Sequence, residues 1–477
     1  MCEIIASISN VMYIYIIIIM LLGVGLYFTI RTKGVQLRLF GESIRVVSEK
    51  SDDENSVSAF EALMVSTASR VGTGNIVGVA NAIAIGGYGA VFWMWIIALV
   101  GGASAFIEST LAQIYKKKDP DGGSYGGPAY YIEAALHSRG LGIVFAAALI
   151  ATYAGGFNML ASYNLIDSFT GYGFYEAAGT ITLGGKEFSV VALAGGAVLA
   201  VLVGVCIFGG GKRIVKVTGV MVPVMGVLYI FMSLVVVVLN ISNVPMVLGH
   251  IFSEAFDFKA IFGGFAGSAL MQGIKRGLYS NEAGVGSAPN AAAAADVSHP
   301  VKQGLVQMLS VFIDTILICT ATALMALCTG IVPSEELKGA PFVQESLATT
   351  FGSFGPYFIT FALLLFAFTT LLGNLFYCEG CLNYIAGHKV NKQGMMVFNL
   401  IAIVLVFLGA QMSFGMVWDL ADVLMGVMAI INLPVIVILG GRAMRALDDY
   451  LEQKRHGNDP VFKKSRAGIT EPTDFWN

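Results

Sequence analysis

The stretch Ser66-Thr-Ala-Ser-Arg-Val-Gly-Thr-Gly-Asn75 interrupts an apolar run that extends from Val57 to Gly86. The run is long enough to cross a bilayer, but its middle carries hydroxyl groups, an amide, two glycines and the cation Arg70. Backbone that leaves the helix at membrane depth is tolerated only where protein buries it or a wet cavity receives it, because each unsatisfied amide in hydrocarbon costs several kcal/mol. The stretch therefore predicts a binding site.

The glycines of this stretch also predict what the site binds. Gly72 and Gly74 give the backbone the freedom to leave the helix. A half-helix that begins near Asn75 then presents free N–H groups and the positive end of its dipole to the gap. Such an end is suited to a carboxylate.

The composition places the rest of the chain in a membrane. Of the 477 residues 56% are hydrophobic and only 12% charged, with a mean hydropathy of +0.76, whereas about a quarter of a soluble domain is charged. Apolar segments of spanning length occur eleven times: 11–31, 57–86, 88–115, 141–171, 187–209, 214–240, 260–295, 303–331, 355–387, 394–412 and 417–440. The first is predicted to be retained, because no Lys or Arg precedes it as in a signal peptide.

The basic residues predict the orientation. Most of the 28 Lys and Arg residues fall in 31–56, 116–140, 210–213, 296–302, 388–393 and the tail, or at the adjoining helix ends. Only Lys186, Lys259 and Lys338 fall on the other side. Cytoplasmic loops are the basic ones, so we expect a multi-pass protein of the cell membrane with its N-terminus outside and its C-terminus in the cytoplasm.

A second interrupted segment, 260–295, mirrors the first, with repeated glycines followed by a polar stretch from Lys275 to Pro289. Each interrupted segment opens a block of five segments, 51–241 and 242–440, and because five is odd the second block is inverted. Paired interruptions of this kind are typical of a transporter's midplane site. The predicted fold is all-α, with eleven transmembrane helices, two of them discontinuous: a peripheral helix and loop in 1–50, a 5+5 inverted repeat, and a cytoplasmic tail, 441–477.

Four stretches resemble one known family when they are taken in order. They are Val71-Gly-Thr-Gly-Asn75, Gly86-Gly-Tyr-Gly-Ala-Val-Phe-Trp-Met-Trp95, Gly127-Pro-Ala-Tyr-Tyr131 and Ser280-Asn-Glu-Ala-Gly284 with Gly286-Ser-Ala-Pro289. Together they resemble the alanine/glycine:cation symporter family, over about residues 60–434. The resemblance implies sodium-coupled, or in some members proton-coupled, uptake of small amino acids on a LeuT-type core with an extra N-terminal helix.

The resemblance also implies where the cation lies. In a LeuT-type core, sodium is held by carbonyls of the first broken helix and two hydroxyls of the eighth core helix, which here are the carbonyls of Ala68 and Val71 and the side chains of Thr369 and Thr370. The alternative is that both threonines cap carbonyls of their own helix, as membrane threonines commonly do.

The amino acid is expected beside the cation. Its carboxylate would meet the amides of the first break, its ammonium would meet exposed carbonyls of both breaks, and its side chain would enter a chamber walled by the fourth segment and the ninth. The amides are those of Thr73, Gly74 and Asn75, and the carbonyls are those of Ser69, Phe265 and Gly267. The chamber is walled by Asn158, Ala161 and Asn374. Alanine carriers commonly have Gln and Trp where this chain has Ala161 and Asn374. The chamber is therefore larger and more polar, so glutamine, serine and asparagine join alanine and glycine as candidate substrates.

Ionisable residues within the segments form a further group of candidates. Arg70 with Lys275, Arg276 and Glu282 would form a gate or charge pair at the inward vestibule, or would be solvated near the cytoplasmic surface. We favour the gate for Arg70, because a charge in mid-segment is costly and usually functional. Glu108, Asp167 and Asp314 are candidates to pair with a cation or relay a proton.

Other function classes find less support in the sequence. No repeated filter motif indicates a channel, and neither a His-Glu-x-x-His nor a Gly-x-Ser-x-Gly motif indicates an enzyme. A proton-coupled or uncoupled facilitator and a substrate-binding membrane sensor remain alternatives. The expected partners are a small neutral amino acid, sodium and the bilayer, with no nucleic acid and no cofactor, and the oligomeric state is left open.

Overall fold

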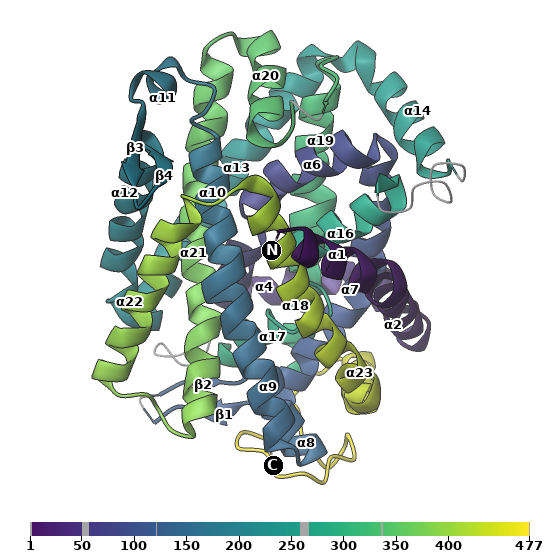
Figure 1. The fold of residues 1–477 in the computed structure, drawn as a ribbon. Helices are drawn as coiled ribbons and strands as arrows, with labels where there is room; N and C mark the ends of the chain where they lie inside the picture. The colour runs from purple at the N-terminus through teal and green to yellow at the C-terminus, as the bar shows by residue number, and fades with distance from the viewer. Residues whose placement is uncertain (1, 50–56, 121, 258–266, 335–336, 477) are drawn as a thin grey trace.

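The structure, a computed structural model, describes residues 2–49, 57–120, 122–257, 267–334 and 337–476 and is almost entirely helical (Figure 1). Within these residues, nine helices are long and apolar enough to cross a membrane. They are α1 (Cys2–Met12) continuing into α2 (Ile18–Arg31), α7 (Gly89–Ile114), α9 (Arg139–Ile150) continuing into α10 (Asn158–Asp167), α12 (Val190–Ile207), α13 (Gly210–Leu239), α18 (Pro300–Val311) continuing into α19 (Thr320–Leu327), α21 (Phe354–Ala386), α22 (Lys392–Gly409) and α23 (Phe414–Arg455). The all-α membrane fold predicted from the sequence is thereby confirmed.

The two segments predicted to be interrupted contain shorter helices. They are α5 (Ala59–Arg70) and α6 (Val77–Gly86) in the first, and α16 (Ala269–Asn281) and α17 (Pro289–Ala294) in the second. At 1.5 Å per residue, α5 and α6 are roughly 18 and 15 Å long, and neither alone crosses a hydrocarbon core about 30 Å thick.

The ends of α5 have local causes. The Oγ atom of Ser58 accepts a hydrogen bond from the Glu61 amide, and the Glu61 carboxylate accepts one from the Ser58 amide, which forms a capping box. The helix ends at Arg70 because the Gly72 amide donates to Oδ1 of Asn75, at 2.8 Å, instead of to the carbonyl of Ala68. A 3-10 turn, Thr73–Asn75, then leads into α6.

The interruption between α16 and α17 depends on left-handed backbone. Glu282, directly after α16, has φ = 54°, and Gly284 and Gly286 have φ values of 83° and 92°. Pro289 then begins α17, a first-turn position that proline favours. We refer to residues 71–76 as the first break and residues 282–288 as the second break.

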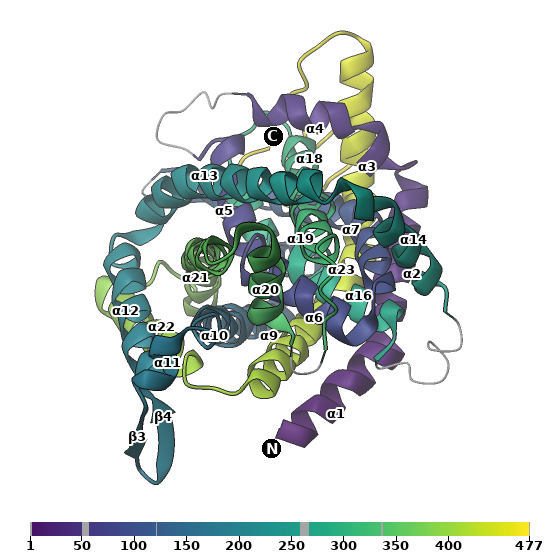
Figure 2. The ribbon, with the colours of Figure 1, turned by 90° about the horizontal axis from the view of Figure 1, so that it is seen from above.

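The remaining elements are short. They are the helices α3 (Val35–Arg38), α4 (Phe40–Val47), α8 (Pro128–Leu136), α11 (Gly173–Ala177), α14 (Val244–Ala255) and α20 (Gly339–Phe351), the antiparallel pair β1 (Lys117–Lys118) and β2 (Ser124–Tyr125), and the antiparallel pair β3 (Thr180–Leu183) and β4 (Lys186–Ser189). Viewed from above, α12, α22 and the β3–β4 hairpin lie at one edge of the molecule, and α1 and α2 lie at another (Figure 2).

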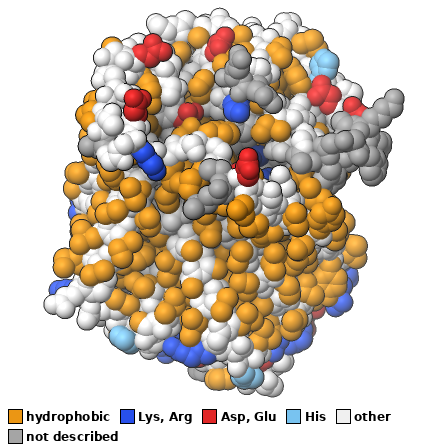
Figure 3. Space-filling model, in the orientation of Figure 1, with side chains coloured by type: hydrophobic (Ala, Val, Ile, Leu, Met, Phe, Trp, Pro, Cys, Tyr) orange, Lys and Arg blue, Asp and Glu red, His pale blue; other side chains and the backbone are white. Residues whose placement is uncertain are grey.

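The breaks lie in the interior of this bundle. α5 packs against α13, α18 and α21, while α6 packs against α16, and α16 packs along α7. On the outer surface, hydrophobic side chains cover a broad middle zone, and Lys and Arg side chains gather near the lower end, where β1, β2, α8 and the C-terminus lie (Figures 1 and 3). The chain is therefore an integral, multi-pass membrane protein that encloses its two breaks.

Candidate functional site

The first break presents free backbone donors. Among the described residues, the amides of Thr73 and Gly74 donate to no protein acceptor, whereas the amide of Asn75 donates to the carbonyl of Gly72 at 3.1 Å. All three residues are buried. Since buried amides are nearly always paired, the two free donors indicate a position for an acceptor that the protein does not supply.

Asn75 joins the first break to the end of α16. Its Nδ2 atom donates to Oγ of Ser280 at 3.1 Å and to Oδ1 of Asp314 at 2.7 Å. Oγ of Ser280 donates to the other carboxylate oxygen of Asp314, and Asp314 is completely buried in the π-helical turn between α18 and α19. The side chain of Asn75 thus holds the break in place.

The expected cation position lies between the first break and α21. A Cβ atom added to Gly72 would overlap Oγ1 of Thr370, so this hydroxyl lies directly against the broken backbone. Oγ1 of Thr370 is buried and has no hydrogen-bond partner in the described part of the chain. The carbonyl of Ala68 does not receive the Gly72 amide, as described above, and Val71 follows α5 directly. The structure therefore brings Ala68, Val71 and Thr370 together.

Thr369 lies in a different environment from its neighbour. Its Oγ1 atom donates to the carbonyl of Leu365 at 2.9 Å, within its own helix, and lies 3.4 Å from Sδ of Met225 on α13. Of the two interpretations of the threonine pair, capping within the helix is what the structure shows for Thr369. Of the two threonines, Thr370 presents to the break an oxygen that has no partner among the described residues.

The predicted chamber residues form a chain of hydrogen bonds. Oγ of Ser69 donates to Oδ1 of Asn374 at 2.6 Å, and Nδ2 of Asn374 donates to Oδ1 of Asn158 at 2.8 Å. Nδ2 of Asn158 is buried without a partner among the described residues. Ala161 lies one turn further along α10 and is completely buried. These four residues from α5, α10 and α21 are brought together around the first break.

Two residues that the sequence did not single out complete the surroundings. The Tyr279 ring covers Gly74 so closely that a Cβ atom there would overlap it, and it packs on Phe157 with ring centroids 4.8 Å apart. Nδ2 of Asn164 donates to Oγ1 of Thr73 at 2.9 Å. Asn164 follows Asn158 and Ala161 at three-residue intervals, and that helical spacing was the signal available in the sequence.

The predicted gate residues separate into two groups. Arg70 is buried, donates to the carbonyl of Gln307 at 3.2 Å, and leaves Nε and Nη2 without a partner among the described residues. Glu282, at the second break, accepts from Oγ of Ser287 at 2.7 Å. Lys275 instead pairs with Asp422 on α23 at 2.8 Å. The structure places Arg70 and Glu282 near the breaks and Lys275 elsewhere.

Arg276 shares this second location. Its guanidinium binds both oxygens of Asp422 at 3.1 Å and stacks over the Trp418 ring at 4.3 Å. The two cations of α16 therefore lie buried against α23 and share one carboxylate, that of Asp422. A buried pair of this kind fixes one helix against another and breaks only at a high cost.

One predicted acceptor for the ammonium group, Gly267, is not brought to the site. Gly267 is exposed and precedes α16, so the full length of that helix separates it from the second break. Phe265 lies outside the described residues. The sequence interpretation took acceptors from the glycine-rich start of segment 260–295, whereas the left-handed residues of the second break lie at 282–286, within the polar stretch from Lys275 to Pro289.

The chain resembles proteins of one family along nearly its whole length. The model of the sodium:alanine symporter family matches residues 1–464. The amino-acid carrier protein AlsT of Bacillus subtilis is 43% identical over 96% of this chain and 94% of its own. The probable sodium/glutamine symporter GlnT of the same organism is 43% identical over 96% of this chain and 92% of its own.

Solved structures agree on the fold. The crystal structure of MhsT in complex with L-phenylalanine, a LeuT-fold transporter, superposes with a TM-score of 0.53 over 87% of this chain and 92% of its own, at 16% identity. With a family model matched over almost all of its length and relatives this similar, the chain belongs to the sodium:alanine symporter family, whose members are transporters and not enzymes.

Proposed function

We propose that the protein is a secondary active transporter that couples uptake of a small neutral amino acid to the inward movement of sodium. One observation carries the proposal: at the first break the amides of Thr73 and Gly74, and the Thr370 hydroxyl against Gly72, have no partner in the part of the chain that the structure describes. Donors suited to an anion and oxygens suited to a cation thus occupy the same short stretch. Family membership and the names of the relatives support the same function.

The sodium ion would be held by the carbonyls of Ala68 and Val71 and by Oγ1 of Thr370. These are neutral oxygens, which bind a monovalent ion weakly enough for release. Thr369, included on the basis of the resemblance, would contribute only through a lone pair left over from its bond within the helix. We assign it a smaller role than Thr370.

The amino acid would lie with its carboxylate at the amides of Thr73 and Gly74, at the positive end of α6. The ring of Tyr279 would cover the other side of Gly74. The ammonium group would meet carbonyl and hydroxyl oxygens near Ser69. Gly267 is too distant to serve as an acceptor.

The side chain of the amino acid would face the pair Asn374 and Asn158. The unpartnered Nδ2 of Asn158 is a donor for a side-chain amide or hydroxyl, so glutamine, serine and asparagine are proposed as substrates besides alanine and glycine. The relative named a sodium/glutamine symporter supports this wider range.

The proposed transmembrane arrangement has eleven crossings. Nine are the long helices, and the other two are α5 with α6 and α16 with α17, each pair discontinuous in the middle of the membrane. The basic face near β1, β2 and the C-terminal tail is assigned to the cytoplasm, which puts the N-terminus outside. During transport, the bundle that holds the broken helices would rock against the remaining helices.

Proteoliposomes test the proposal. Labelled alanine and glutamine should accumulate when sodium is higher outside, and should not accumulate when potassium replaces sodium or when the sodium gradient is absent. Accumulation driven by a proton gradient alone would identify the proton-coupled alternative. Equal uptake with and without a sodium gradient would contradict the coupling, and binding without any flux would indicate a sensor.

A further inference from the structure

The chain beyond α23 folds back over the end of the protein where β1, β2 and α8 lie, which we call the tail side (Figure 1). We call residues 456–476 the C-terminal strap. Phe462, Ile469 and Trp476 in this strap are buried, which is unusual for a segment without regular structure. The strap therefore has defined docking contacts.

The first docking contact is with the loop that precedes α18. Ser298 donates from Oγ to the carbonyl of Pro460 at 2.8 Å and accepts the amide of Phe462 on its own carbonyl at 3.0 Å. The Phe462 ring packs on the ring of His299, with centroids 4.9 Å apart. Nearby, Lys302 on α18 binds Asp459 at 3.2 Å.

The second docking contact is with the end of α7 and with β1. Nε1 of Trp476 donates to the carbonyl of Gln113 at 2.8 Å. Asp474 binds Nζ of Lys117 at 3.0 Å. The Phe475 ring lies 4.5 Å from Nζ of the buried Lys116, a cation–π distance.

The second contact leads to Ala295, which follows α17, and the first contact begins three residues further along the chain, at Ser298. The carbonyl of Ala295 accepts from Nζ of Lys116 and from Nε2 of Gln113, each at 2.8 Å. Ala295 also forms a parallel bridge with Val57, where the amide of Asp296 donates to the Val57 carbonyl at 2.8 Å. Val57 immediately precedes the cap of α5. The strap thus holds the junction at which the tail-side ends of α5 and α17 meet.

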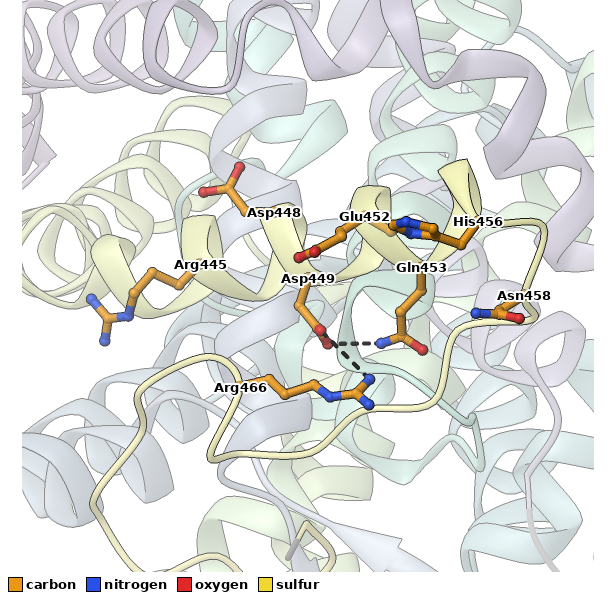
Figure 4. Close-up of a pocket in the computed structure, with 8 residues that line it drawn as sticks. All are labelled: Arg445, Asp448, Asp449, Glu452, Gln453, His456, Asn458 and Arg466. Carbon is orange, nitrogen blue, oxygen red and sulfur yellow. Dashed lines mark hydrogen bonds and ion pairs between the residues drawn. The ribbon is translucent and has the colours of Figure 1, made fainter.

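Between these contacts, the strap is bonded to α23: Nε of Arg445 donates to the carbonyl of Ala467 at 2.6 Å, and Nε of Arg442 donates to Glu471 at 2.9 Å. A polar hollow of about 580 Å³ lies beside these bonds, lined by Arg445, Asp448, Asp449, Glu452, Gln453, His456, Asn458 and Arg466. Figure 4 shows Asp449 and Arg466 reaching toward each other across it, 4.0 Å apart. The middle of the strap is thus anchored on α23, and from this base its two ends reach the loop before α18 and the end of α7.

From these contacts we infer that the C-terminal strap is a latch that keeps the tail side of the transporter closed and undocks when that side opens. The inference rests on the proposed function, since opening on the tail side requires the inner ends of α5 and α17 to move. A strap that binds their junction to α7 and to the base of α23 resists that movement. It acts by position and touches neither the amino acid nor the ion.

A reversible cross-link tests the latch. Lys117→Cys and Asp474→Cys place thiols at the two ends of the ion pair, in a background that carries Cys2→Ser. The cysteines at 206, 319, 328, 378 and 381 are buried and do not compete for the reagent. A flexible, disulfide-containing bismaleimide should lower sodium-driven uptake in proteoliposomes at least tenfold, and reductive cleavage should restore it. The two single-cysteine variants, treated identically, are the matched controls. Sodium-induced thermal stabilisation of the cross-linked protein should be unchanged.

A second variant weakens the latch. Trp476→Ala favours the tail-side-open state, so fewer molecules are ready to bind external sodium and the half-saturating sodium concentration should rise several-fold. Val461→Ala, at an exposed position of the strap, should leave that concentration unchanged. The latch is refuted if the cross-linked protein, verified by its mass, imports as fast as the cleaved protein. Absence of sodium-driven uptake in the unmodified protein would refute the proposed function instead.

Discussion

Replacing Thr370 with valine tests the assignment of the cation site most directly. Valine keeps the shape of threonine but puts a methyl group where Oγ1 lies against Gly72. Because Oγ1 has no partner in the described protein, the exchange breaks no protein hydrogen bond. Any functional loss is then a loss of something that the hydroxyl does for a ligand.

The expected magnitude follows from the value of one oxygen to a buried cation. A polar contact to a charged group contributes about 1.5–3 kcal/mol, which corresponds to roughly a 10- to 100-fold change in affinity. Thr370→Val should therefore raise the sodium concentration for half-maximal uptake by about that factor, with the maximal rate recovered at saturating sodium. Thr369→Val is the matched control, because the Thr369 hydroxyl already bonds within its helix, and its effect should be less than about threefold.

Two measurements check this prediction. Uptake of labelled alanine is titrated with sodium in proteoliposomes, and the melting temperature of the purified protein is titrated with sodium in detergent, since a ligand of the native state stabilises in proportion to its occupancy. Both titrations should shift together for Thr370→Val. Equal shifts for the two threonine variants, or no shift for Thr370→Val, would refute the placement of the ion against Gly72.

Three further changes probe other parts of the structure. Gly74→Ala should abolish alanine uptake, because its Cβ would overlap the ring of Tyr279. Gly219→Ala should not, because no atom lies within 4 Å of its Cβ. Asn374→Trp, the residue common in alanine carriers, should weaken competition by glutamine against labelled alanine at least about tenfold while glycine still competes. The hydrogen bond from Arg45 lowers the pKa of Glu42 to about 2. The free energy of unfolding of the native protein should therefore exceed that of Glu42→Gln above pH 4.5, and this difference should disappear between pH 4.5 and 2. A difference that does not change with pH would contradict this.

Much of the fold is readable from the sequence because hydrocarbon imposes strict rules. The nine long helices lie where uninterrupted apolar segments predict them, and the helix α5 ends within Ser66–Asn75, where glycines and polar groups are incompatible with lipid. The second break is harder to place. Glycines occur at both ends of segment 260–295, and only the backbone angles at Glu282, Gly284 and Gly286 show which of them leave the helix.

The partners of charged and polar side chains are the part that sequence does not reveal. Lys275 was expected near Glu282, seven residues away, but pairs with Asp422 on a helix far along the chain. Thr369 and Thr370 are adjacent in sequence, yet about 100° apart on the helix, so that one faces Met225 and the other faces Gly72. Such outcomes depend on how helices pack around each other, and local patterns carry no information on that.

The position of Thr370 also explains how one short break can couple two ligands. The carbonyls assigned to sodium belong to Ala68 and Val71, and the free amides assigned to the carboxylate belong to Thr73 and Gly74, so in the proposed site both ligands would bind to a single stretch of backbone held by Asn75. An ion that orders this stretch lowers the cost of ordering it for the amino acid, and linkage makes the effect reciprocal. A weakened ion site must then also weaken amino-acid binding at low sodium, although Thr370 lies on the cation side of the break. In the proposed site, coupling would therefore be a property of the backbone between Val71 and Asn75, and no residue would have to contact both ligands.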